Sequence, residues 1–95
     1  MIERHIPFRV GEDQGADFER FFAEQYRPAA LEMPGLLSIA LLRLQDRPSQ
    51  YRMVFRWQDA PSAVAWRVSP VHEALQPRLR ELAEMGEIHV FDVVA

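Results

Sequence analysis

The sequence predicts an α+β domain with a ferredoxin-like fold, in which strands and helices follow one another in the order βαββαβ. Four segments show the alternating or continuous apolar character of strands, and two longer stretches repeat apolar residues every three or four positions, as helices do. A turn of hairpin length joins the two middle strands. This order gives a four-stranded antiparallel sheet with both helical regions on one face.

The first half of the chain contains a strand, a helical region and a second strand. Residues 2–10 alternate between apolar and polar side chains, which is the period of a strand with two unlike faces. Apolar residues at helical spacing follow over residues 18–33, and Asp13 is in position to cap this helix. Pro28 predicts a kink or a restart, because proline has no amide hydrogen to donate. Residues 36–45 are almost continuously apolar, which is typical of a strand covered on both faces.

The second half contains a strand, two helical segments and a last strand. Residues 51–57 alternate again, and their aromatic and methionine side chains share one face. Asp59 is a candidate cap for the helix that follows, and Ser69 followed by Pro70 predicts that a new helix begins there at a different angle. Residues 87–94 have the character of the fourth strand.

The length of the chain leaves room for one hydrophobic core, so we expect a single domain over residues 1–95. The absence of cysteine removes disulfides and thiolate metal sites as support for so small a core, and association is the support that remains. The strand over residues 36–45 is apolar on both faces, and the topology leaves one sheet face uncovered. We therefore expect a homodimer in which two sheets face each other and form a dimeric α/β barrel.

Charge and hydropathy exclude two classes of partner. The net charge is −3 and the arginines are spread along the chain, whereas nucleic-acid binding needs a basic patch. No apolar run is long enough to cross a membrane, and the N-terminal residues lack the form of a signal peptide, so we expect a cytoplasmic protein. Lysine, asparagine and threonine are absent, which is typical of the coding bias of a GC-rich bacterial genome.

Three short motifs resemble a known family. They are Met33-Pro34-Gly35-Leu36-Leu37, Phe55-Arg56-Trp57 and Ser69-Pro70-Val71-His72. In this order and spacing they resemble the antibiotic biosynthesis monooxygenase superfamily of dimeric α/β-barrel proteins, and the likeness covers nearly the whole chain. The superfamily includes cofactor-independent monooxygenases of polycyclic phenols, haem-degrading enzymes and members without an assigned activity. The resemblance therefore implies the fold, and function has to be argued from the site.

The haem-degrading branch of this superfamily uses a tryptophan, which Trp66 matches, a histidine ligand ten residues further on, and an asparagine on the first strand. Gln76 occupies the histidine position, and the chain has no asparagine. A glutamine amide is a poor axial ligand, and moving the ligand to His72, about one helical turn earlier, is the less favoured alternative. We expect no haem, and without cysteine or a glycine-rich phosphate loop we expect no metal or flavin either.

Oxygen chemistry without a cofactor requires a base that deprotonates an electron-rich substrate, so that the resulting anion can pass an electron to O2. His72 is the candidate catalytic base and Trp66 the candidate pocket wall, because both lie in the interrupted helical region. We expect Trp57, Tyr26 and Arg56 to contact the substrate as well. The alternative is structural, with Trp66 filling the core and His72 capping a helix or facing solvent.

Charged and histidine residues on the strands also have two interpretations. Arg52 and Arg56 share a face and could hold an anionic substrate, but ion pairs with Glu3 or Glu87 across the strands are preferred. His5 and His89, on neighbouring strands, could form a proton relay or a metal site, but an ordinary cross-strand pair is preferred because no carboxylate at a convincing spacing completes a ligand set.

The sequence thus predicts a cofactor-independent monooxygenase that acts on a small aromatic substrate of the phenol or quinol type. The alternative is a non-catalytic, ligand-binding or stress-associated dimer of the same fold. A cavity with converging polar groups favours the enzyme, whereas a dimer with a structural role can fill that space with side chains.

Overall fold

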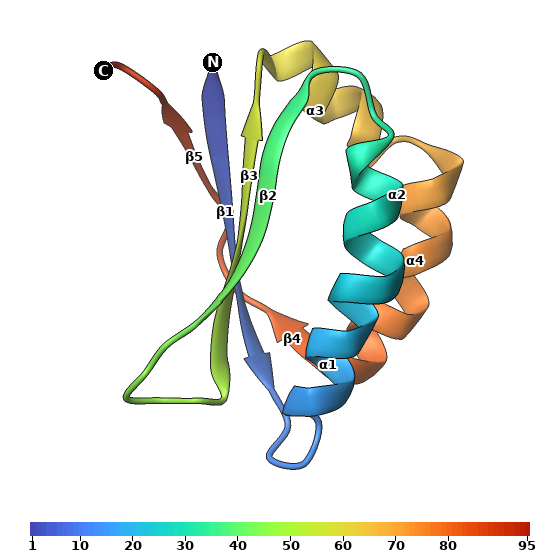
Figure 1. Ribbon diagram of the computed structural model, residues 1–95, viewed down its shortest axis with the longest axis vertical. Coiled ribbons are helices and arrows are strands. Elements are labelled where there is room, and N and C mark those ends of the chain that lie inside the picture. Colours follow the sequence, from blue (N-terminus) through green and yellow to red (C-terminus); the bar gives the residue numbers. More distant parts are fainter.

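The computed structural model describes residues 1–95 and has the expected α+β, ferredoxin-like architecture. The strands form one antiparallel sheet in the order β2-β3-β1-β4, and a fifth strand, β5, also pairs with β1 (Figure 1). They are β1 (Ile2–Val10), β2 (Leu36–Arg43), β3 (Gln50–Trp57), β4 (Ala83–Met85) and β5 (His89–Asp92).

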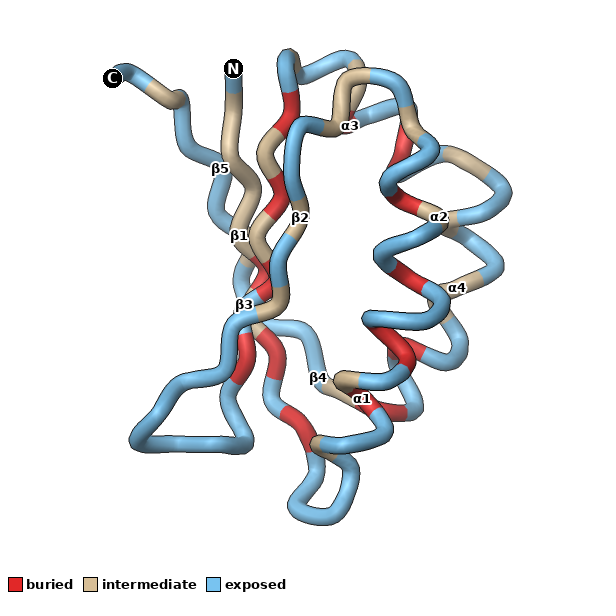
Figure 2. The backbone as a smooth tube through the Cα atoms, viewed as in Figure 1, coloured by how far each residue is buried: buried red, intermediate tan, exposed pale blue.

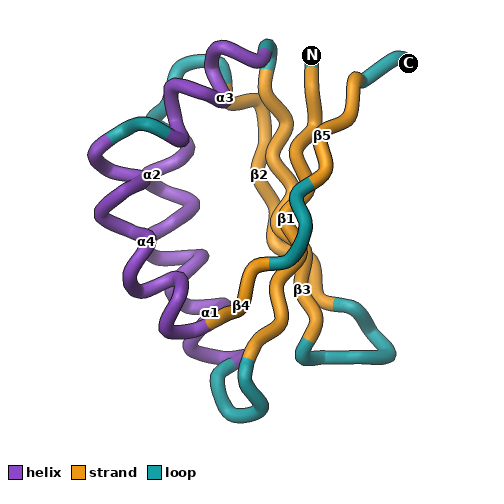
Figure 3. The backbone as a smooth tube through the Cα atoms, turned by 180° about the vertical axis from the view of Figure 1, so that it is seen from behind, coloured by secondary structure: helices purple, strands orange, loops and turns teal.

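All helices cover the same face of this sheet, and the opposite face is bare (Figure 3). The first helical region consists of α1 (Gly15–Phe21), a π-helical turn η1 (Phe22–Tyr26) and α2 (Arg27–Leu31), and the second consists of α3 (Ala60–Arg67) and α4 (Pro70–Leu82). In Figure 1 the two regions run side by side along one side of the sheet. They form the second layer of a two-layer fold.

The predicted interruption at Pro28 takes the form of the π-helical turn. The amide of Arg27 donates to the carbonyl of Phe22, five residues back, and α2 begins in the next turn. A wider turn accommodates a proline that lacks the amide hydrogen of an ordinary helix interior. The predicted cap at Asp13 is wrong: Gln14 precedes the helix, and no side chain caps its first turn.

The expected fourth strand over residues 87–94 corresponds to the shorter β5 (His89–Asp92), and a further short strand, β4 (Ala83–Met85), precedes the expected range. β4 pairs with Phe8–Val10 and β5 pairs with Ile2–His5, so the interruption lies opposite Pro7. Proline cannot donate a ladder hydrogen bond, and the chain instead bends at Gly86, whose amide donates to the Pro7 carbonyl at 2.8 Å. The predicted four-stranded sheet is therefore a five-stranded one.

The core lies between the sheet and the helices, and it is entirely apolar. Sixteen side chains are buried, none of them polar or charged, and they lie where the two layers face each other (Figure 2). The alternation in β3 is confirmed, because its aromatic and methionine side chains are all buried: Tyr51, Met53, Phe55 and Trp57.

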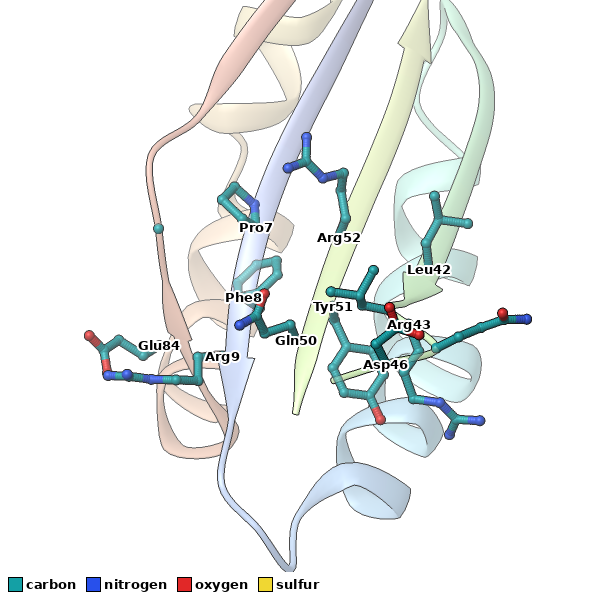
Figure 4. Close-up of a pocket in the computed structure, with 13 residues that line it drawn as sticks. Pro7, Phe8, Arg9, Leu42, Arg43, Asp46, Gln50, Tyr51, Arg52 and Glu84 are labelled. Atoms are coloured by element: carbon teal, nitrogen blue, oxygen red, sulfur yellow. The ribbon is translucent and has the colours of Figure 1, made fainter. Parts of the chain in front are cut away.

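The face of the sheet away from the helices carries both charged and apolar side chains. Glu3 accepts two hydrogen bonds from Arg56, at 3.0 and 2.8 Å, as the preferred ion-pair interpretation predicts for Arg56, and it contacts His5 at 2.8 Å. His5 and His89 lie directly opposite each other on β1 and β5. A hollow of about 770 Å³ occupies one end of this face, with the Arg9 and Glu84 pair at one side and Leu42 at the other (Figure 4).

Candidate functional site

A cavity of about 180 Å³ lies between the sheet and the α3–α4 region. One half of its lining is apolar and comes from Ile6, Phe8, Phe55, Leu79, Met85 and Ile88. The other half carries polar or ionisable groups and comes from Arg4, Tyr26, Trp66, Arg67, His72 and Gln76. Apolar walls with a few convergent polar groups are typical of small-molecule sites.

The break between α3 and α4 positions the helical part of this site. Asp59 caps α3 by accepting from the Ser62 amide at 2.9 Å. Ser69 caps α4, since its hydroxyl oxygen accepts from the His72 amide at 3.1 Å, and the same hydroxyl donates to the Trp66 carbonyl at 2.8 Å. One serine therefore links the backbones of the two candidate residues.

Trp66 and His72 meet across this break. Their ring centroids are 5.2 Å apart and the ring planes are inclined by 76°. Six residues apart on one straight helix, these side chains would point away from each other. The change of axis at Pro70 brings them to the same cavity, which is the proximity expected from the sequence.

His72 is held as a neutral imidazole. Burial lowers its pKa most, and the cations of Arg4 and Arg67 lower it further, while a backbone hydrogen bond of Arg67 acts in the opposite direction. The amide nitrogen of Gln76 lies 3.1 Å from His72 Nε2. With the amide in this orientation, Gln76 donates to an unprotonated Nε2, the atom that a base must offer.

Tyr26 remains protonated in the same cavity wall. It is 1% exposed, and burial raises the pKa of its phenol to about 12, against the smaller opposing effects of Trp66 and Arg4. Its ring lies edge-on to Trp66, with centroids 5.8 Å apart. Tyr26 can therefore act as a hydrogen-bond donor or acceptor near the cavity but not as a base at neutral pH.

The indole Nε1 of Trp66 is the one buried side-chain nitrogen or oxygen in the chain without a hydrogen-bond partner. The side chain is 1% exposed, and although the Tyr26 hydroxyl is near, the two groups do not reach hydrogen-bond geometry. Buried donors of this kind are rare in native proteins, because each costs stability when it is left unpaired. Their presence at a cavity is a reason to look for a ligand.

Two of the predicted substrate contacts lie elsewhere. Trp57 is in the core, stacked on Phe55 with centroids 6.0 Å apart, and does not line the cavity. Arg56 is on the opposite face of the sheet, where it pairs with Glu3. The structure thus brings together His72, Trp66 and Tyr26 but neither Trp57 nor Arg56.

Sequence reasoning missed the two arginines of the cavity, Arg4 and Arg67, and assigned no role to Gln76. Arg4 carried a signal, because it occupies an inward position in the alternation of β1, on the same face as Ile6 and Phe8. An arginine where the pattern calls for an apolar residue indicates a special environment. No comparable feature of the sequence distinguishes Arg67 or Gln76 as a cavity residue.

Comparison with known proteins agrees with this architecture. Residues 1–78 match the family model described as antibiotic biosynthesis monooxygenase. The chain belongs to this family. No protein among the curated sequences matches it.

Solved structures similar to this family member share its fold at low sequence identity. SnoaB, a cofactor-independent oxygenase from Streptomyces nogalater, is 23% identical, with a TM-score of 0.88 over 99% of this chain and 93% of SnoaB. A Bordetella bronchiseptica protein, provisionally assigned as an antibiotic biosynthesis monooxygenase, is 26% identical, with a TM-score of 0.87 over 99% and 97% of the two chains. A conserved protein of unknown function from Bacteroides thetaiotaomicron is 20% identical, with a TM-score of 0.82 over 95% and 94%.

Two further features of this family member bear on its ligands. No group of three or more histidine, cysteine, aspartate or glutamate side chains is arranged to hold a metal ion. None of the helices has the length and apolar character needed to span a bilayer.

Proposed function

We propose that the protein is a cofactor-independent monooxygenase that oxidises a small aromatic substrate of the phenol or quinol type. The observation that carries the proposal is the neutral His72 imidazole, in contact with Trp66 at a cavity lined by apolar and polar groups. Membership of the family and the likeness to SnoaB in fold support a reaction of this class.

The chemistry requires only a base, a dry pocket and O2. His72 takes the phenolic proton, and the electron-rich anion then reduces O2. When a ring C–H para to the hydroxyl becomes a quinone carbonyl, one oxygen atom enters the product and the other leaves as water. The phenol and one O2 supply all the atoms and electrons of this conversion, so the reaction needs no external reductant.

The other cavity residues have distinct roles in this proposal. Trp66 and Phe55 pack against the substrate ring, since aromatic side chains supply large apolar surfaces with defined geometry. Gln76 holds the His72 ring through the contact at Nε2 and moves aside when that nitrogen takes the substrate proton. Tyr26 stays protonated and offers a hydroxyl at the cavity wall.

The variant His72→Ala tests the base. Turnover should fall by roughly a hundredfold or more, the usual contribution of a positioned base, while secondary structure is retained. His89→Ala is the matched control, because the His89 side chain is 52% exposed and lies outside the cavity; since His89 is on the bare sheet face, light scattering checks that this variant keeps the mass of the wild type. Oxygen consumption is measured against a panel of mono- and dihydroxy aromatic compounds, and incorporation of one 18O atom from 18O2 identifies a monooxygenase.

The pH profile gives a second readout of the same assignment. Because burial lowers the pKa of His72 from its usual 6.5, activity should persist below pH 6.5 and then decline as the imidazole is protonated. Full activity of His72→Ala on an authentic substrate would overturn the role of His72. A visible absorption band or stoichiometric metal in the active protein would overturn the cofactor-independent mechanism.

The proposed enzyme is a homodimer built on the bare sheet face. That face carries large exposed apolar side chains, including Leu42 at 52% and Phe91 at 49% exposure, beside the charged pair of Glu3 and Arg56. An apolar sheet face is a liability on a monomer, and a second copy is the partner whose face is complementary under twofold symmetry.

Light scattering tests the dimer. The wild type should have twice the mass of the 11.1 kDa chain at micromolar concentration, and Leu42→Glu should shift the equilibrium to the monomer. Val68→Glu is the control, since Val68 is 74% exposed at the end of α3, away from the sheet face. A wild-type monomer at these concentrations would contradict the barrel.

A further inference from the structure

The charges of the cavity define a narrower class of ligand. We propose that the substrate is a single-ring aromatic acid whose carboxylate binds beside Arg4 and whose ring lies against Trp66. The aromatic character of the ligand rests on the proposed function. The charge and the size of the ligand are inferred from the cavity itself.

The cavity is electropositive in an otherwise acidic protein. Its lining includes two arginines, Arg4 and Arg67, but no aspartate or glutamate, although the chain has a net charge of −3. Neither arginine forms an ion pair within the chain, and neither side chain donates a hydrogen bond there. Arg67 is exposed, but Arg4 is half-buried, and a half-buried guanidinium without a counter-ion is unusual because burial of a charge is costly unless it is paired.

Arg4 is fixed at this position by the strand that carries it. It faces the helices from the middle of the sheet, where β1 is paired on both sides, with β3 at Phe55 and with β5 at Val90. Burial and the like charge of Arg67 both lower the pKa of Arg4, so the two cations oppose each other across the same space. An anion between them would relieve the repulsion, and an arginine fork matches the planar geometry of a carboxylate.

The unpaired Nε1 of Trp66 is an independent observation that points to the same class. It is a buried donor without an acceptor, on a residue that lines the cavity. An oxygen of an anionic ligand can accept from it, whereas a cationic or purely hydrocarbon ligand cannot. Arg4, Arg67 and Trp66 thus offer only donors, and the ligand has to supply the acceptors.

The size of the cavity limits the ligand to one ring. A dry apolar cavity of roughly 150 Å³ holds benzene, so the 180 Å³ here suits a substituted benzene. A polycyclic phenol would need the walls to move apart. The cavity offers apolar surface for one ring, from Phe55, Leu79 and Ile88. The donors of Arg4, Arg67 and Trp66 are available to a polar group at one edge of that ring.

Calorimetric titration under nitrogen tests the class, since binding without O2 does not depend on turnover. The probes are 3,4-dihydroxybenzoate and its neutral isostere 3,4-dihydroxybenzamide, with 3-hydroxy-2-naphthoate as the two-ring acid. The benzoate should bind at least ten times more tightly than the benzamide. Arg4→Gln should weaken benzoate binding by roughly 10- to 100-fold, as expected when a charged hydrogen-bond partner is lost, and should leave benzamide binding nearly unchanged.

Two further variants keep this result interpretable. Arg4→Lys retains the charge and should restore part of the preference for the acid. Arg47→Gln removes an equal charge from the exposed turn between β2 and β3 and should change neither affinity.

The outcomes separate this inference from the proposed function. Equal affinities for acid and amide, tighter binding of the two-ring acid, or no binding of either one-ring compound would overturn the single-ring acid class, even if another phenol is oxidised. Binding of the benzoate that depends on Arg4, with no oxygen consumption by any aromatic acid, would support the class and overturn the oxygenase.

Discussion

Replacing Trp66 by phenylalanine should leave the stability of the protein almost unchanged while weakening the binding of its ligand. The phenyl ring lacks two carbon atoms and the nitrogen of the indole. The two lost carbons reduce the free energy of unfolding by about 1.6 kcal/mol, at about 0.8 kcal/mol each, and a residual void adds to this loss. Removing the unpaired Nε1 raises the free energy of unfolding by about 1–3 kcal/mol, because a buried unsatisfied donor no longer costs stability. The two effects nearly cancel.

Trp57 provides the matched comparison. It is also 1% exposed, but its indole nitrogen is not a buried donor without a partner. Trp57→Phe therefore loses the same carbons without the compensating gain, and it should be about 1–3 kcal/mol less stable than Trp66→Phe. Because Trp57 lies outside the cavity, this variant should bind ligand normally.

Urea unfolding followed by far-ultraviolet circular dichroism measures both variants without relying on tryptophan fluorescence. All samples are compared at one protein concentration, because an associating protein gains apparent stability by mass action. The slope of the free energy against urea should stay constant, so that the midpoints report stability alone. If Trp66→Phe is as unstable as Trp57→Phe, or less stable, the Trp66 nitrogen carries no uncompensated cost and the reasoning is refuted.

Two other predictions concern backbone strain and alkaline pH. Gly35→Ala should destabilise the protein by about 2 kcal/mol or more, because Gly35 has a φ of 88° and a β-carbon there would lie 2.7 Å from the β-carbon of Ser62. In thermal melting, the double variant Gly35→Ala with Ser62→Gly should recover part of the lost stability. No loss of stability in the single variant would contradict the close approach. The pKa of Tyr26 is raised to about 12, so the folded protein keeps the phenolic proton at pH values where the unfolded chain, near pH 10, loses it. The free energy of unfolding should therefore be unaffected by this group below pH 10 and should fall by up to about 3 kcal/mol towards pH 12. Phenolate absorbance should develop late in the wild type, and Tyr26→Phe should lack that part of the pH dependence; a phenol at Tyr26 that titrates near 10 would contradict its burial.

Most of the fold could be predicted because local chemistry and global architecture agree. The alternation of residues 2–10 and 51–57 reflects a sheet with one buried face, and the pattern survives in the burial of each side chain. Asp59 and Ser69 cap the helices that they were expected to cap, since a short oxygen-bearing side chain before an apolar repeat has few other uses. The helix break that Ser69 and Pro70 predict also accounts for the proximity of His72 and Trp66.

The remaining features depend on contacts between distant parts of the chain. The extra strand β4 and its break from β5 depend on Pro7, about 80 residues earlier, and residues 87–94 contain nothing that marks the break. Arg4 could have been recognised from its inward position in β1, but its proximity to Arg67 and Tyr26 required the packing of helices on the sheet. Trp57 and Arg56 were expected near the substrate, but their places in the core and on the opposite face follow from the alternation of β3 alone.

The proline in β1 also affects how the cavity can exchange its contents. Residues 86–88 make a single backbone hydrogen bond, from Gly86 to Pro7, whereas β4 and β5 on either side are held by ladder pairs. Met85, which precedes this segment, and Ile88, its last residue, both line the cavity. Displacing these three residues breaks one backbone hydrogen bond and leaves the ladder pairs on both sides in place. The amide hydrogen that Pro7 lacks therefore leaves a weakly held segment in the sheet, next to the cavity.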